Sequence, residues 1–174
     1  GAGWFALRRG RTPAAGFVWL DDRSAKIVAA LVPAVLDGSL PGDGQARRAA
    51  IRDVVSAFDR AIAGLAPGVQ EEIAQLFSLL GLAAGRFIVA GVRSTWAEAT
   101  GDEVNAFLRR WRTSRFSLLR AGYQALTQLI VAAWYGNPAS WAHIGYPGPP
   151  ALAAMKHVGV NVAADALMTA AYTG

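Results

Sequence analysis

Residues 134–150 constrain this chain more than any other stretch, because they combine helix-breaking residues with large aromatic side chains. The prolines and glycines, which oppose both helix and strand, are Gly136, Pro138, Gly145, Pro147, Gly148, Pro149 and Pro150. The rings are Trp134, Tyr135, Trp141 and Tyr146. A ring of this size typically buries roughly 150–250 Å² of surface. We therefore expect an irregular segment that packs against another surface.

The composition is more apolar than that of an ordinary soluble domain. Hydrophobic residues make up 53% of the 174 residues and charged residues 17%, against typical values of about 45–50% and about 25%. The apolar runs 27–36 and 81–92 are interrupted by Pro33 and Arg86, and both are shorter than the roughly 18 residues of a membrane-spanning helix. Two interpretations stay open: an alanine-rich helical protein with a large core, or a chain whose apolar surface is covered by a partner.

The charge is distributed unevenly along the chain. The formal net charge is +5, yet no carboxylate occurs between Val104 and Ala164. The basic residues of that stretch are Arg109, Arg110, Arg112, Arg115, Arg120 and Lys156. A surface of one sign steers an acidic partner. Nucleic acid needs the same charge, but no nucleic-acid-binding motif accompanies it, so we predict no nucleic acid among the partners.

Apolar residues at helical spacing predict an all-α fold, an irregular helical bundle. Helices are expected from Asp21, over 46–64, from Pro67 and, with breaks, over 82–97. Asp21 or Asp22 suits the N-cap of the first helix, and Pro67 suits the first turn of the third. No segment has the alternating pattern of a strand, so the sequence predicts a fold built of helices alone.

The helix expected over 46–64 has one apolar and one charged face. The residues predicted to point inward are Ile51, Val54, Val55, Phe58 and Ile62. The residues predicted to point outward are Arg47, Arg48, Arg52, Asp59 and Arg60. This assignment leaves these five charged side chains in solvent.

One long helix is predicted in the C-terminal half, over about 102–135. Thr100 and Glu103 have the spacing of a capping box, and the helix would be roughly 50 Å long. Its apolar stripe is Val104, Leu108, Trp111, Arg115, Leu118, Gly122, Leu126, Leu129 and Ala133. Two interpretations of Arg115 stay open: its guanidinium reaches solvent along the stripe, or it is a paired internal arginine.

Three regions follow from these patterns. Residues 1–20 form an apolar and basic N-terminal segment, 21–135 a helical domain, and 136–174 an extended partner-binding tail. The first segment is interpreted as the remnant of an export signal, as a peripheral membrane anchor or as a loose terminus. For residues 151–174, a further helix that closes the bundle is the alternative to an extended chain.

The sequence lacks the residues of a recognisable active site or metal site. It has no cysteine and two histidines, His143 and His157, and these are too few for a zinc site. Glu71, Glu72, Asp102 and Glu103 lie where helices are expected to begin, so helix capping explains them. No nucleophile elbow, phosphate-binding loop or covalent haem motif occurs. We therefore predict no catalytic residue, no metal ligand and no cofactor in this chain.

The C-terminal half resembles the gluconate 2-dehydrogenase subunit 3 (gamma subunit) family, the small subunits of membrane-associated FAD-dependent dehydrogenases. The more specific block is Trp134-Tyr135-Gly136-Asn137-Pro138, then Trp141, then Gly145-Tyr146-Pro147-Gly148-Pro149. Before it, the matching residues are Phe107-Leu108, Trp111, Ser114, Leu119-Arg120-Ala121-Gly122-Tyr123, Leu126 and Ala133. The resemblance covers about a third of the chain, and the first hundred residues match only in their general helical character.

The resemblance implies a helical, cofactor-free subunit that binds a large FAD-containing subunit of the glucose-methanol-choline oxidoreductase type. It also implies a periplasmic, membrane-associated complex that passes electrons to a cytochrome c subunit or to quinone. Small subunits of this family typically carry the twin-arginine signal that exports the folded flavoprotein. Here Arg8 and Arg9 follow the apolar stretch, whereas such a signal needs its arginine pair before the apolar segment.

The predicted partner-binding residues are Trp134, Tyr135, Asn137, Pro138, Trp141, Gly145, Tyr146, Pro147, Gly148 and Pro149. Proline and glycine fix an extended path, and tryptophan and tyrosine supply anchors. The alternative is that these rings cap the ends of their own helices. Two other hypotheses stay open for the whole chain: a stand-alone helical protein that binds a ligand or a membrane surface, and an enzyme in its own right.

Overall fold

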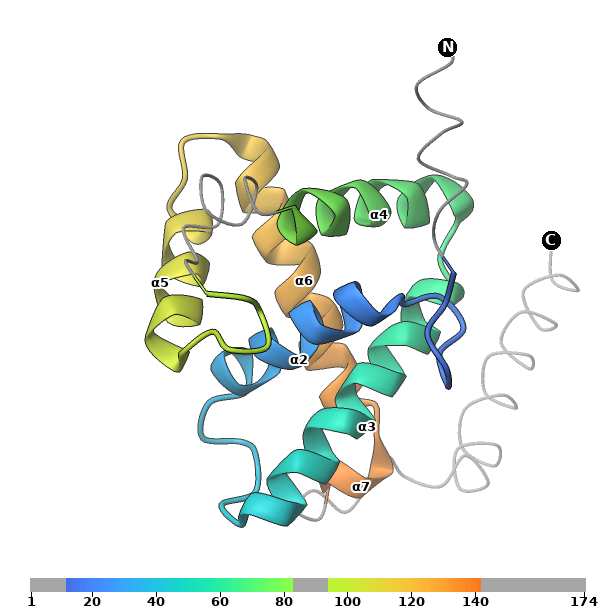
Figure 1. The fold of residues 1–174 in the computed structure, drawn as a ribbon, viewed down its shortest axis with the longest axis vertical. Helices are drawn as coiled ribbons and strands as arrows, with labels where there is room; N and C mark the ends of the chain where they lie inside the picture. The colour runs from blue at the N-terminus through green and yellow to red at the C-terminus, as the bar shows by residue number, and fades with distance from the viewer. Residues whose placement is uncertain (1–11, 83–93, 142–174) are drawn as a thin grey trace, which may run out of the picture. The chain divides into compact units, whose positions relative to one another are not determined.

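The computed structural model describes residues 12–82 and 94–141, and over these residues the fold is all-α (Figure 1). The chain divides into two compact units, Gly1–Ile144 and Gly145–Gly174, and all described residues belong to the first. Its helices are α2 (Asp22–Val35), α3 (Gly44–Ala63), α4 (Pro67–Gly81), α5 (Gly101–Arg112), α6 (Ser117–Tyr135) and the short α7 (Pro138–Trp141). The helical fold class predicted from sequence is thereby confirmed.

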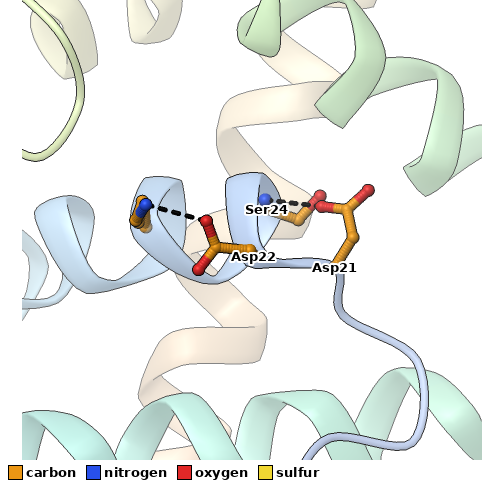
Figure 2. A network of polar contacts seen from close by, with 4 residues as sticks. Asp21, Asp22 and Ser24 are labelled. Carbon is orange, nitrogen blue, oxygen red and sulfur yellow. Dashed lines mark hydrogen bonds and ion pairs between the residues drawn. The ribbon is translucent and has the colours of Figure 1, made fainter. Parts of the chain in front are cut away.

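The first helix begins where the sequence predicted. Figure 2 shows the Asp21 carboxylate accepting a hydrogen bond from the backbone N–H of Ser24 at 2.8 Å, so Asp21 is the N-cap. Asp22 lies in the first turn of α2, and its carboxylate pairs with the Lys26 ammonium one turn later at 2.7 Å. Each carboxylate therefore lies at the positive end of the helix dipole.

Later helices also begin at residues suited to their N-termini. Asp43 accepts a hydrogen bond from the backbone N–H of Ala46 and caps α3. Pro67 occupies the first turn of α4. Thr100 and Glu103 form the predicted capping box, in which each side chain accepts from the backbone N–H of the other. The starts of these helices follow from local chemistry that is legible in the sequence.

The core lies where α2, α3 and α6 meet, with α4 and α5 packed around them. Its largest buried side chains are Trp111, Phe58, Phe77, Phe107, Leu20, Ile27, Leu31, Ile62, Leu80, Leu126, Ile130 and Val28. Phe58 meets Phe77 edge to face with ring centroids 6.2 Å apart, and Phe107 meets Trp111 at 4.6 Å. These pairs connect α3 to α4 and fix one face of α5.

The prediction for residues 82–97 is wrong where the structure describes them. Residues 94–100 form a turn and not a helix. Trp96 is buried there and stacks edge to face on Phe107 at 5.4 Å, while its indole N–H donates to the Leu80 carbonyl at 2.8 Å. A single side chain thus ties the end of α4 to α5. Residues 83–93 lie outside the described part of the chain.

Asp59 was predicted to face solvent, and this is wrong. It is 2% exposed, and its carboxylate accepts three backbone N–H groups, from Val18 at 2.8 Å, Trp19 at 2.8 Å and Leu20 at 2.7 Å. A charged group can be buried when several donors satisfy it. The donors lie 39 to 41 residues away in the chain, so the helical pattern around Asp59 contains no trace of them.

The single helix predicted over 102–135 is also wrong, because the chain breaks between Arg112 and Ser117. The Thr113 hydroxyl donates to the Arg109 carbonyl at 3.0 Å, and the Ser114 hydroxyl accepts from the Phe116 N–H at 3.1 Å. Serine and threonine offer the backbone such alternatives to helical hydrogen bonds. The break places Arg115 in the turn, exposed to solvent, so neither interpretation of Arg115 on a continuous stripe applies.

After the turn, α6 folds back against α5 at a glycine. A Cβ atom on Gly122 would lie 2.9 Å from the Trp111 ring and 3.4 Å from Leu76 of α4. The missing side chain therefore makes room for the indole and lets three helices approach one another closely. The turn and this close contact together set the direction in which α6 crosses the core (Figure 1).

Candidate partner interface

The predicted binding segment begins where α6 ends. Gly136 donates its N–H to the Ala132 carbonyl at 2.8 Å, and Asn137 donates its N–H to the Trp134 carbonyl at 3.1 Å. A Cβ on Gly136 would lie 2.8 Å from the Ala132 oxygen, which is too close for any other residue without a shift of the backbone. Pro138 then starts α7. Among the described residues, Gly136 thus ends α6 where the sequence predicted.

Trp134 does not present its ring to a partner in this structure. It is 2% exposed and belongs to the core with its neighbour Ala133. Its predicted role as a partner contact therefore needs correction, because the ring is covered by the chain itself. The physical reason is the register of α6: Ile130 and Trp134 are one turn apart on the buried face.

Tyr135 and Trp141 lie at the end of α6 and differ from Trp134. Tyr135 is 46% exposed. Trp141 is partly exposed, and its indole N–H donates to the Tyr135 carbonyl at 2.8 Å. The polar end of Trp141 therefore caps a carbonyl at the end of α6, as the alternative interpretation of these rings expected. Tyr135 keeps its side chain on the surface, where it can contact another molecule.

A groove of about 810 Å³ runs between α3 and the end of α6. Its lining residues are Asp53, Ser56, Ala57, Arg60, Ala61, Ala132, Ala133, Gly136, Asn137 and Pro138. The alanines leave space between the helices, and the exposed side chains of Asp53 and Arg60 supply charges of both signs. The geometry suits an inserted side chain or short segment of another chain, with polar groups to orient it.

The structure brings two predicted residues, Asn137 and Pro138, to this groove. The α3 side of the groove was not predicted. Ser56, Ala57, Arg60 and Ala61 lie on one face of α3 at helical spacing, and a face of small residues bordered by charge is the signal that the sequence offered. Gly145, Tyr146, Pro147, Gly148 and Pro149 lie outside the described part of the chain.

A second hollow, of about 480 Å³, lies between α2 and the start of α5. Its charged lining residues are Lys26, Asp37 and Arg47, and half of the remaining lining residues are alanines. Lys26 is already paired with Asp22. Among its lining residues, Asp37 is the single carboxylate, and there is no histidine or hydroxyl side chain.

The described residues also contain no group of three or more histidine, cysteine, aspartate or glutamate side chains that could hold a metal ion. Within residues 12–82 and 94–141, no helix has the length and hydropathy to cross a bilayer. No protein-family model, curated protein or solved structure matches this chain.

Proposed function

We propose that this chain is the non-catalytic small subunit of a periplasmic, membrane-associated flavoprotein complex. It binds, stabilises and helps to export a large FAD-containing dehydrogenase of the glucose-methanol-choline type, which oxidises a sugar or alcohol. Electrons then pass to a cytochrome c subunit or to quinone. FAD belongs to the large subunit, and this chain holds no cofactor.

The observation that carries the proposal is the groove at the end of α6. Asn137 and Pro138 line it, and the chain runs on from Trp141 into the aromatic and proline-rich residues 142–149. Asn137 and Pro138 belong to the Trp134–Pro149 block in which the family resemblance is most specific. Exposed Tyr135 supplies an aromatic anchor beside it, of the kind that carries much of the energy of protein interfaces.

The proposed role is thermodynamic and not chemical. A subunit that binds only the folded flavoprotein stabilises it by mass action. The small side chains of Ala57, Ala61 and Ala132 would admit an apolar side chain of the large subunit, and Asp53 and Arg60 would set its register. This division leaves substrate choice and redox chemistry to the large subunit.

The test is purification of the complex through a tag on this chain, from cells that also express the flavoprotein. The proposal predicts a yellow complex in which bound flavin elutes with this chain at a mass well above 18.3 kDa. Arg60→Glu, on the groove, is expected to reduce the flavin recovered per mole of chain roughly tenfold. Arg48→Glu changes an exposed arginine of the same helix outside the groove and is the matched control.

Purification of the wild-type chain as a stable, flavin-free monomer in the presence of the flavoprotein would contradict the proposal. The stand-alone alternative predicts that result, together with a ligand bound in one of the two hollows.

A further inference from the structure

The corner between α5 and α6 combines exposed apolar side chains with exposed arginines. Phe116 is 58% exposed, and Leu118, at 73%, is the most exposed large apolar side chain among the described residues. The residues of this surface, which we call the basic corner, are Phe116, Leu118, Arg109, Arg110, Arg112, Arg115 and Arg120. Figure 1 shows the connection between α5 and α6 at the periphery of the helices, at the upper left.

The parts of α5 and α6 that form the basic corner contribute positive charge only. Neither helix contributes a carboxylate between Val104 and Trp141. Three of the arginines lie in the last turn of α5, where cations also interact favourably with the helix dipole. A concentration of guanidinium groups of this kind attracts phosphate, with which arginine forms paired hydrogen bonds.

Local hydrogen bonds hold the corner in shape. The Arg120 guanidinium donates to the Ser114 carbonyl at 2.6 Å, and the Phe116 N–H donates to the Ser114 hydroxyl at 3.1 Å. The guanidinium carbon of Arg115 lies 5.0 Å from the centre of the Phe116 ring. A cation and an aromatic ring are thus presented together on a turn whose backbone is already ordered, which lowers the entropy lost on binding.

We propose that the basic corner binds the surface of a bilayer that contains anionic phospholipids. The arginines contact lipid phosphates, and Phe116 and Leu118 enter the boundary between headgroups and acyl chains. The two protruding apolar side chains favour an anionic bilayer over other anionic ligands. A nucleic acid backbone would satisfy the arginines but offer nothing to Leu118, and an acidic protein would need a hollow complementary to both side chains. The proposal is independent of the flavoprotein, because vesicles alone supply the ligand.

The test is co-sedimentation of the full chain with vesicles of phosphatidylcholine, alone or mixed with phosphatidylglycerol. Binding is expected only to the mixed vesicles and should weaken as ionic strength rises. Arg112→Gln with Arg115→Gln should lower the partition coefficient roughly 25-fold, or about fivefold for each charge. Phe116→Ser with Leu118→Ser should lower it roughly tenfold without any change of charge.

The matched control is Arg48→Gln with Arg52→Gln, which removes two exposed arginines of α3 and should leave binding within about twofold of wild type. Equal loss in this control would overturn the proposal, since net charge alone would then explain binding. Absence of binding, equal binding to neutral vesicles, or full binding by both corner variants would also overturn it. So would binding of polyglutamate or an oligonucleotide that equals vesicle binding and is unchanged by the two serine substitutions.

Discussion

The two ends of α6 have similar apolar sequences but opposite surroundings. At the C-terminal end, Trp134 is buried and Trp141 donates a hydrogen bond to the last turn. At the N-terminal end, Phe116 and Leu118 are exposed among arginines. Helical spacing alone placed Leu118 and Ala133, the neighbour of Trp134, on one apolar stripe. The difference shows that an apolar residue becomes core only where another helix covers it, as α3 covers the C-terminal end.

The largest expected effect in this comparison is at the buried end. Trp134→Ala should lower the free energy of unfolding by about 3–5 kcal/mol, because it removes a large ring and leaves a cavity. Leu118→Ala, at the exposed end, should change it by less than about 0.5 kcal/mol. Urea denaturation followed by far-ultraviolet circular dichroism measures both. Similar losses for the two variants would contradict the contrast.

The next effect concerns the hydrogen bonds made by Asp59 of α3, the helix that packs against the buried C-terminal end of α6. Asp59→Ala should lower the free energy of unfolding by about 3 kcal/mol, because it leaves the N–H groups of Val18, Trp19 and Leu20 without their carboxylate. Asp59→Asn should cost less, since an amide oxygen can replace the oxygen that accepts from Trp19 and Leu20. Asp53→Ala, an exposed residue of the same helix, is the control. An unchanged stability in Asp59→Ala would show that the three bonds contribute nothing.

A smaller effect is expected where α6 crosses α5. Gly122→Ala should lower the free energy of unfolding by about 1–3 kcal/mol, because the new methyl group would lie against the Trp111 ring. Gly68→Ala lies in α4 with open space around it, and it should leave stability unchanged or raise it by up to about 1 kcal/mol. If both substitutions proved stabilising, the close contact at Gly122 would be refuted.

The smallest effect is at the exposed end and has the opposite sign. Phe116 is the N-cap of α6 and makes no side-chain capping hydrogen bond. Phe116→Ser supplies a preferred capping hydroxyl and should raise the free energy of unfolding by about 0.5 kcal/mol. A clear loss in the same denaturation experiment would mean that the ring packs against the protein instead of facing solvent.

Features fixed by neighbouring residues were predicted: the N-cap at Asp21, the capping box at Thr100, Pro67 at the start of α4, and the end of α6 before Gly136. Each depends on side-chain and backbone chemistry within a few residues.

Features fixed by distant residues were not predicted. Burial of Asp59 depends on a segment about forty residues earlier. The break before Ser117 depends on Thr113 and Ser114, whose hydrogen bonds prevailed over a continuous apolar pattern. The α3 side of the groove was not predicted either, because it depends on how α3 packs against the end of α6. Of the predicted site, Asn137 and Pro138 line the groove, whereas Trp134 belongs to the core.

The most direct test compares charge reversal at the groove and at the basic corner. Arg60→Glu and Arg112→Glu are each assayed for flavin recovered with the tagged chain and for sedimentation with anionic vesicles. We expect Arg60→Glu to lose flavin and keep vesicle binding, whereas Arg112→Glu should keep flavin and lose vesicle binding. The assignment of two separate surfaces would be contradicted if either variant lost both properties. It would also be contradicted if both variants kept both properties.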